Sequence, residues 1–183
     1  MFYKEFPEIK INNDYLLELA NTIIENDSWE SIRRLQKRDK FNFEFSGLDM
    51  VENTDPAKRR EYLARVVFAH RMDTEEREKA GIHANSAWMF KTNINTRVYV
   101  HRESRAIALN FPVIFEPGKS FVGFYDDKLN ELSRHTLNEP NAVYYNVENW
   151  HAVINESLLL PRIVLTCSDL TGDWKDKVYH DIA

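Results

Sequence analysis

Two histidines and one glutamate are the residues of this chain whose types and spacing are best suited to chemistry. His101 and Glu103 lie two residues apart, and His151 follows much later, directly after Trp150. Two histidines and one carboxylate are the ligand set that holds non-haem Fe(II) while leaving positions on the ion open. Arg162 comes after His151, and a guanidinium is suited to a bidentate contact with a carboxylate cosubstrate. The pattern indicates a metal centre with an anion site near it.

Strand parity explains how such a site could be built. The stretch Thr96–His101 is rich in β-branched and aromatic residues, which predicts a strand. Side chains two apart on a strand share a face. We therefore expect Val98 and Val100 on one face and, on the other, a polar set made of Tyr99, His101, Glu103 and Arg105. The third ligand must come from elsewhere, and His151 opens a second β-like run, His151–Asn155.

The same residues also have simpler interpretations. The charged segment 101–105 is compatible with a solvated turn, His151 with a hydrogen-bonded core histidine, and Arg162 with a surface position. The order of the segments favours the metal site: a strand with His-x-Glu, further strands, a strand with His, and then a strand with Arg.

Two segments resemble the Fe(II)/2-oxoglutarate-dependent dioxygenase superfamily, in the hydroxylase branch that includes prolyl and aspartyl/asparaginyl hydroxylases. The first is Val100–Arg105 running into Ala108–Val113, and the second is Trp150–Asn155 followed by Pro161–Leu165. The resemblance covers about residues 93–168. It implies a mainly β fold with flanking α-helices: a double-stranded β-helix, or cupin-like jelly roll, with N-terminal helices packed outside.

The resemblance also implies roles for individual residues. His101, Glu103 and His151 would be the catalytic Fe(II) ligands, and Arg162 would hold the distal carboxylate of 2-oxoglutarate. With O2, the implied reaction hydroxylates a C–H bond of an amino acid, peptide or small metabolite and releases succinate and CO2. Arg105 is expected at the barrel mouth, because the chain should turn near Ser104, and there it would contact the primary substrate.

The chain departs from the family pattern at two positions. Glu103 stands where Asp is commoner, and Val164 stands where a serine or threonine usually follows the arginine. Thr166 or Tyr99 could supply the missing hydrogen bond to the cosubstrate, and the sequence does not choose between them. Because Glu103 fills the position that halogenases leave open, hydroxylation is expected rather than halogenation. The alternatives are a cupin-like metal-binding protein, a non-oxidative metalloenzyme without 2-oxoglutarate, and a non-catalytic interaction domain.

The surrounding elements suit one domain of 183 residues. We expect a helical part over 1–87, a jelly-roll core over 88–170 and a tail over 171–183. An apolar stripe over 15–24 predicts a helix capped by Asn13 or Asp14, and a second helix should begin at Asp55-Pro56. Asp73 and Glu76 can form the capping box of a short helix that Gly81 ends. Strands are predicted over 106–113, 120–125, 142–147, 151–155 and 162–168.

Composition narrows the setting and the partners. The net charge of −5 argues against general nucleic-acid binding. A single cysteine, Cys167, is no disulfide framework and suits a reducing compartment. The N-terminal residues lack the apolar core of a signal peptide, and no apolar run reaches membrane-spanning length. We expect a cytoplasmic protein, not bound to membranes, that acts on a small-molecule or peptidyl substrate; the oligomeric state stays open.

Overall fold

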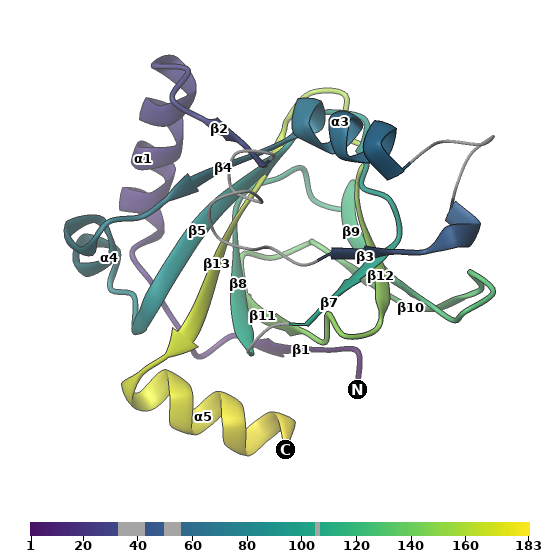
Figure 1. Ribbon diagram of the computed structural model, residues 1–183. Helices are drawn as coiled ribbons and strands as arrows, with labels where there is room; N and C mark the ends of the chain where they lie inside the picture. Colours follow the sequence, from purple (N-terminus) through teal and green to yellow (C-terminus); the bar gives the residue numbers. More distant parts are fainter. Residues whose placement is uncertain (33–42, 50–55, 105–106) are drawn as a thin grey trace.

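The computed structural model describes residues 1–32, 43–49, 56–104 and 107–183, and its strands form two sheets (Figure 1). The seven-stranded sheet has the order β1 (Tyr3–Phe6), β11 (Ala142–Tyr145), β8 (Ala108–Ile114), β13 (Arg162–Leu170), β5 (Ala84–Thr92), β4 (Val67–Arg71) and β2 (Glu30–Ser31). The six-stranded sheet has the order β10 (Glu131–Thr136), β9 (Ser120–Tyr125), β12 (Trp150–Asn155), β7 (His101–Glu103) and β3 (Phe43–Phe45), with β6 (Thr96–Arg97) paired beside β12.

The strand pairing is that of a jelly roll. From β5 onward the first strand pairs with the last, β5 with β13, and the next inward pairs are β7 with β12, β8 with β11, and β9 with β10. All of these pairs are antiparallel, and they fall alternately in the two sheets. A long hairpin folded over on itself produces this arrangement. The predicted fold class, a double-stranded β-helix with helices outside, is therefore confirmed.

Three helices cover the outer face of the seven-stranded sheet: α1 (Asn13–Glu25), α4 (Thr74–Ala80) and α5 (Gly172–Ile182) (Figure 1). On β13, Ile163, Leu165 and Cys167 join the core beneath these helices. The alternate residues of β13, Arg162, Val164 and Thr166, line a cavity between the sheets. Because side chains alternate along a strand, one face of β13 packs beneath the helices and the other face lines the cavity.

The other helical elements within the described ranges are α3 (Pro56–Val66) and the short 3-10 turn η1 (Gly47–Asp49). The predicted capping box of α4 is confirmed, and Gly81 ends the helix at φ 70° in the left-handed region. The prediction for α1 was wrong by one residue: Asn12 is the N-cap, and its side chain accepts a hydrogen bond from the amide of Tyr15. Asp55, the predicted cap of α3, lies outside the described residues.

Two other expectations need correction. The segment 1–87 is not only helical, because it supplies β1, β2, β3, β4 and the start of β5, and β10 and α5 were not predicted either. Segment 96–101 is not one strand: β6 ends at Arg97 and β7 begins at His101. The short edge strands were missed because they carry too few residues to show a period. Within the described ranges, no helix combines the length and apolar character needed to cross a bilayer.

Candidate metal centre

His101, Glu103 and His151 converge at the start of two neighbouring strands. His101 on β7 is paired directly with His151 on β12, and their ring centroids are 4.3 Å apart. Glu103 lies two residues along β7, and its Oε1 is 3.4 Å from His101 Nε2 and 3.8 Å from His151 Nε2. All three side chains are buried or nearly so, and one ligand atom from each lies within 4.8 Å of the others.

The two imidazoles are oriented in the same way. His101 Nδ1 lies 2.7 Å from the carbonyl oxygen of Tyr99, and His151 Nδ1 lies 2.9 Å from the carbonyl oxygen of Asn149. A carbonyl only accepts, so each Nδ1 carries the hydrogen and donates it. In the neutral form, each ring therefore presents its Nε2 lone pair toward Glu103. Backbone contacts of this kind commonly fix the orientation of metal-binding histidines.

The electrostatics of the cluster suit a cation. Burial first, and then the neighbouring His101, lower the pKa of His151 and favour its neutral form. Two imidazole lone pairs and a carboxylate oxygen then face one another. Two ligand atoms bonded at about 2.1 Å to one ion lie ~3–4 Å apart, which is the range of the nitrogen–oxygen distances here. The donor set fits a divalent metal ion with nitrogen and oxygen ligands.

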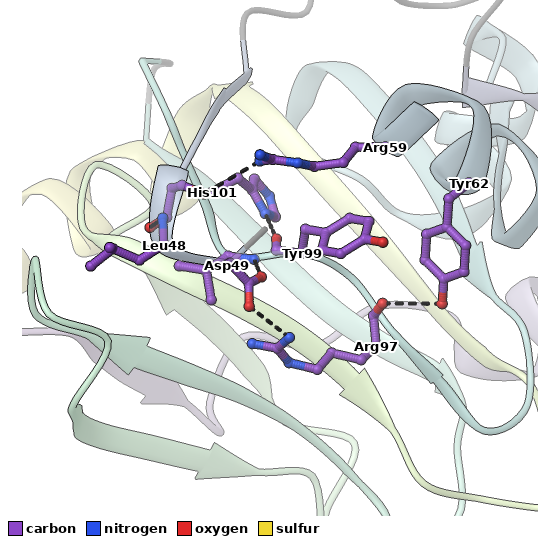
Figure 2. Close-up of polar contacts among 9 residues, drawn as sticks. Leu48, Asp49, Arg59, Tyr62, Arg97, Tyr99 and His101 are labelled. Carbon is purple, nitrogen blue, oxygen red and sulfur yellow. Dashed lines mark hydrogen bonds and ion pairs between the residues drawn. The ribbon is translucent and has the colours of Figure 1, made fainter. Parts of the chain in front are cut away.

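A polar network holds the chain just before His101 (Figure 2). Asp49 accepts a hydrogen bond of 2.5 Å from the amide of Val100 and one of 2.9 Å from Arg97. Ser46 pairs through its backbone with Val100, and its carbonyl accepts from the buried guanidinium of Arg59 at 3.3 Å. These contacts bridge the irregular stretch between β6 and β7. They fix where His101 enters its strand.

The three candidate ligands, His101, Glu103 and His151, line a cavity of about 110 Å³ between the two sheets, called here the central cavity. Part of its wall is an apolar group that packs together as one cluster, made of Ile32, Leu63, Val67 and Val98, with Val153 against it. Another part is polar and consists of Asn110, Tyr145, Arg162 and Thr166 together with the three candidate ligands. The central cavity therefore offers a polar region beside the cluster and an apolar region for a hydrophobic group.

Arg162 is the cationic residue of the described cavity wall. It is 6% exposed, and its Nε has no hydrogen-bond partner in the part of the chain that the structure describes. The Tyr145 side chain interacts electrostatically with the guanidinium, and no described carboxylate forms an ion pair with it. Burial lowers the pKa of Arg162 from its usual value, although a guanidinium stays charged at neutral pH. An uncompensated buried cation of this kind is costly unless a ligand neutralises it.

The structure brings together most of the residues that the sequence singled out. His101, Glu103, His151, Arg162 and Thr166 all line the central cavity. Thr166 donates a hydrogen bond of 2.8 Å to the side-chain oxygen of Asn110.

Tyr99 is not among the cavity-lining residues, whereas Val98 is, so the expected division of faces was wrong. The break between β6 and β7 shifts the parity, and the Tyr99 ring packs edge-on against Tyr62 at 5.3 Å. Arg105 lies outside the described residues. Tyr145 and Asn110 were missed, because nothing in their local sequence distinguishes them from other strand residues.

The fold and the cluster define a jelly-roll protein with a candidate two-histidine, one-carboxylate metal centre. No protein-family model matches the sequence, and no curated protein matches it. Among solved structures, a cupin 2 domain-containing protein from Halorhodospira halophila is similar over 70% of this chain and 80% of its own, with 13% identity and a TM-score of 0.40.

Two plant proteins are also similar to the chain. Procruciferin, an 11S globulin from Brassica napus, has 11% identity and a TM-score of 0.38 over 58% of this chain. Vicilin from Corylus avellana has 10% identity and a TM-score of 0.39 over 64% of this chain. The chain spans only 27% of procruciferin and 37% of vicilin. The fold assignment rests on the strand pairing, and the chemistry rests on the residues of the site itself.

Proposed function

We propose that this protein is an Fe(II)- and 2-oxoglutarate-dependent oxygenase that hydroxylates an unactivated C–H bond. The observation that carries the proposal is the pairing, in one cavity, of three converging candidate ligand atoms with a buried guanidinium for which the described residues supply no counter-ion. His101, Glu103 and His151 would hold the iron. Iron with this ligand set keeps positions open for a chelating cosubstrate and O2, and so supplies oxidative chemistry.

Charge balance supports a dicarboxylate as the cosubstrate. A divalent ion and Glu103 together carry a net charge of about +1, and Arg162 adds one more positive charge in the same cavity. A dianion neutralises both. One carboxylate would lie toward the metal ligands, and the other would form charge-assisted contacts with Arg162 and Tyr145. A metal-binding jelly roll without such a cosubstrate gives no reason for the buried guanidinium.

The apolar wall supports a substrate that brings a hydrocarbon group into the central cavity. Val98 and Val153 belong to the same wall as the metal ligands, and Leu63 and Val67 continue it. These side chains exclude water and make no hydrogen bonds, so they can select a C–H group by contact alone. Their role is placement of the primary substrate, an amino acid side chain, a peptidyl residue or a small metabolite with an apolar part.

The test measures succinate formation from 2-oxoglutarate by anaerobically iron-loaded protein after O2 is admitted. We expect slow uncoupled turnover with the wild type, none with His151→Ala, and a raised 2-oxoglutarate KM with Arg162→Ala. Binding of Fe(II) without any succinate formation or 2-oxoglutarate binding would refute the oxygenase. That result would favour the alternative, a metal-binding jelly roll or non-oxidative metalloenzyme.

A further inference from the structure

A chain of polar side chains leads from Arg162 to the surface of the molecule. Tyr145 lines the central cavity together with Arg162 and interacts electrostatically with the guanidinium, and its hydroxyl lies 2.8 Å from His135 Nδ1. His135 Nε2 lies 2.7 Å from Glu5 Oε1, and the second oxygen of Glu5 accepts from Asn141 at 3.2 Å. Arg162, Tyr145 and Glu5 belong to β13, β11 and β1 of the seven-stranded sheet, and His135 belongs to β10 of the six-stranded sheet, so the path crosses between the sheets at His135 and returns.

Burial differs sharply along this chain. Tyr145 and His135 are each 6% exposed, whereas the side chain of Glu5 is 43% exposed. Glu5 is held by the pairing of β1 with β11, where Tyr3 lies opposite Tyr145 and packs its ring 4.6 Å from that of His135. An exposed carboxylate is thus coupled to a buried hydroxyl that lines the central cavity.

The number of available hydrogens restricts how these groups can be arranged. Arg162 carries only donors, so its interaction with Tyr145 does not use the tyrosine hydrogen, and Tyr145 has that one hydrogen to place. Burial raises the pKa of Tyr145 well above its usual value, so that hydrogen is retained. When His135 is neutral, Nε2–H donates to Glu5 and Nδ1 accepts the hydrogen of Tyr145. When His135 is protonated, Nδ1–H donates to Tyr145 instead, and the tyrosine hydrogen is released.

We propose that Glu5 and His135 are positioning residues for the anion bound at Arg162, because protonation of His135 turns the Tyr145 hydrogen into the central cavity, where it donates to a carboxylate oxygen. The proton that His135 gains at Nδ1 comes from solvent, and Glu5 is the exposed group that stabilises the resulting imidazolium. This inference rests on the proposed function, since the anion is the cosubstrate dicarboxylate.

The other groups around His135 do not duplicate this role. Tyr3 is the second titratable side chain that β1 brings against the ring, and Val122 is the partner of His135 on β9. On β10 itself, Arg134 pairs with Glu131 at 2.7 Å on the exposed surface. Glu5 is therefore the one described carboxylate that contacts His135.

The proposal predicts that binding of the dicarboxylate takes up a proton. A carboxylate that gains a hydrogen bond from Tyr145 should bind on the order of 10-fold to 100-fold more tightly when His135 is protonated. The affinity should fall as pH rises through the titration of His135. By reciprocity, bound dicarboxylate should shift that titration to higher pH.

The experiment titrates 2-oxoglutarate into anaerobic Fe(II)-loaded protein from pH 5.5 to 8.5 and follows the His135 ring nitrogens by ¹⁵N NMR in Zn(II)-loaded protein. We expect His135→Gln to remove the pH-dependent component of the affinity that the wild type shows. Glu5→Gln should move the midpoint of this pH dependence to lower pH. Glu131→Gln, a matched loss of charge on the strand that carries His135, should leave the midpoint unchanged. The Tyr145→Phe variant should bind 2-oxoglutarate weakly at every pH, because it lacks the hydroxyl.

Two outcomes separate this inference from the proposed function. Suppose that Arg162→Ala weakens 2-oxoglutarate binding, but the pH profile of binding is the same in wild type, His135→Gln and Glu5→Gln. That result overturns this inference and leaves the proposed function standing. Absence of 2-oxoglutarate binding at every pH overturns both. If His135→Gln does not fold, the midpoint shift of Glu5→Gln decides, since Glu5 is largely exposed. A His135 ring whose NMR titration does not respond to bound 2-oxoglutarate also contradicts the inference.

Discussion

Replacing Arg162 should have opposite effects on ligand binding and on stability. The residue is 6% exposed, and within the described residues its Nε has no hydrogen-bond partner and its guanidinium forms no ion pair with a carboxylate. Truncating one partner of a buried, charge-assisted contact typically costs 2–5 kcal/mol, roughly a 30- to 5,000-fold loss of affinity. We therefore expect Arg162→Ala to raise the 2-oxoglutarate Kd by at least tens of fold, while Fe(II) still binds. Arg162→Lys should recover only part of the loss, because an ammonium lacks the planar fork.

The same residue should weaken the unliganded protein. Replacing buried charged groups with hydrophobic residues of similar size is often stabilising by about 1–4 kcal/mol. Arg162→Met should therefore raise the Tm of the metal-free protein, by roughly 2–4 °C for each kcal/mol in a chain of this size. The variant should not bind the dicarboxylate.

The assays are anaerobic titration of 2-oxoglutarate, followed through the visible band of the iron complex, and thermal unfolding by circular dichroism. Arg60→Met is a suitable control, because Arg60 is an exposed arginine on α3 and lies outside the cavity wall. An unchanged Kd in Arg162→Ala would refute the anion site. A strongly lowered Tm in metal-free Arg162→Met would refute the view that the buried Arg162 cation destabilises the unliganded protein.

Four further predictions concern other residues. His101→Ala or His151→Ala should abolish stoichiometric Fe(II) binding, measured by metal analysis after anaerobic gel filtration; tight binding in the double variant would contradict the site. Glu103→Asp should keep part of the activity, whereas Glu103→Ala should lose hydroxylation, as measured by product formation. Arg105→Ala should raise the KM of the primary substrate more than that of 2-oxoglutarate, and the reverse pattern in steady-state kinetics would exchange the roles of the two arginines. Burial raises the pKa of the Cys167 thiol, so alkylation at pH 8 should be slow in the native protein and fast in urea, and equal rates would contradict its burial.

Much of the central architecture could be predicted from local sequence because the long strands carry clear signals. Ser120–Tyr125 has the predicted bounds of β9, and β12 and β13 begin within one residue of the prediction. His101 and Glu103 were recognised by their His-x-Glu spacing, although β7 has only three residues, and His151 was recognised by its place at the start of β12. The register that places His101 directly opposite His151 is a tertiary property, fixed by the pairing of β7 with β12.

The incorrect predictions share one physical cause: they concern backbone segments whose conformation is fixed by contacts with residues distant in sequence. The irregular stretch before His101 is stabilised by Asp49 and Ser46, which are distant in sequence, and its β-branched residues alone favour a continuous strand. Strand β1 has only four residues and is ordered by its pairing with β11. Local propensity does not contain either interaction, so parity counted along the sequence placed Tyr99 on the wrong side.

The contacts behind Arg162 show why a site of this kind extends beyond what a motif contains. A motif identifies groups that meet a ligand directly, and His101, Glu103, His151 and Arg162 were identified in that way. The protonation and orientation of those groups depend on partners that the fold supplies, such as the carbonyl of Tyr99 for His101. Tyr145 performs the same function for Arg162, and it connects the guanidinium through His135 to a carboxylate on the first strand. If protonation of His135 controls the Tyr145 hydrogen, residues without any sequence signature set the affinity of the site, and the N-terminal strand becomes part of its chemistry.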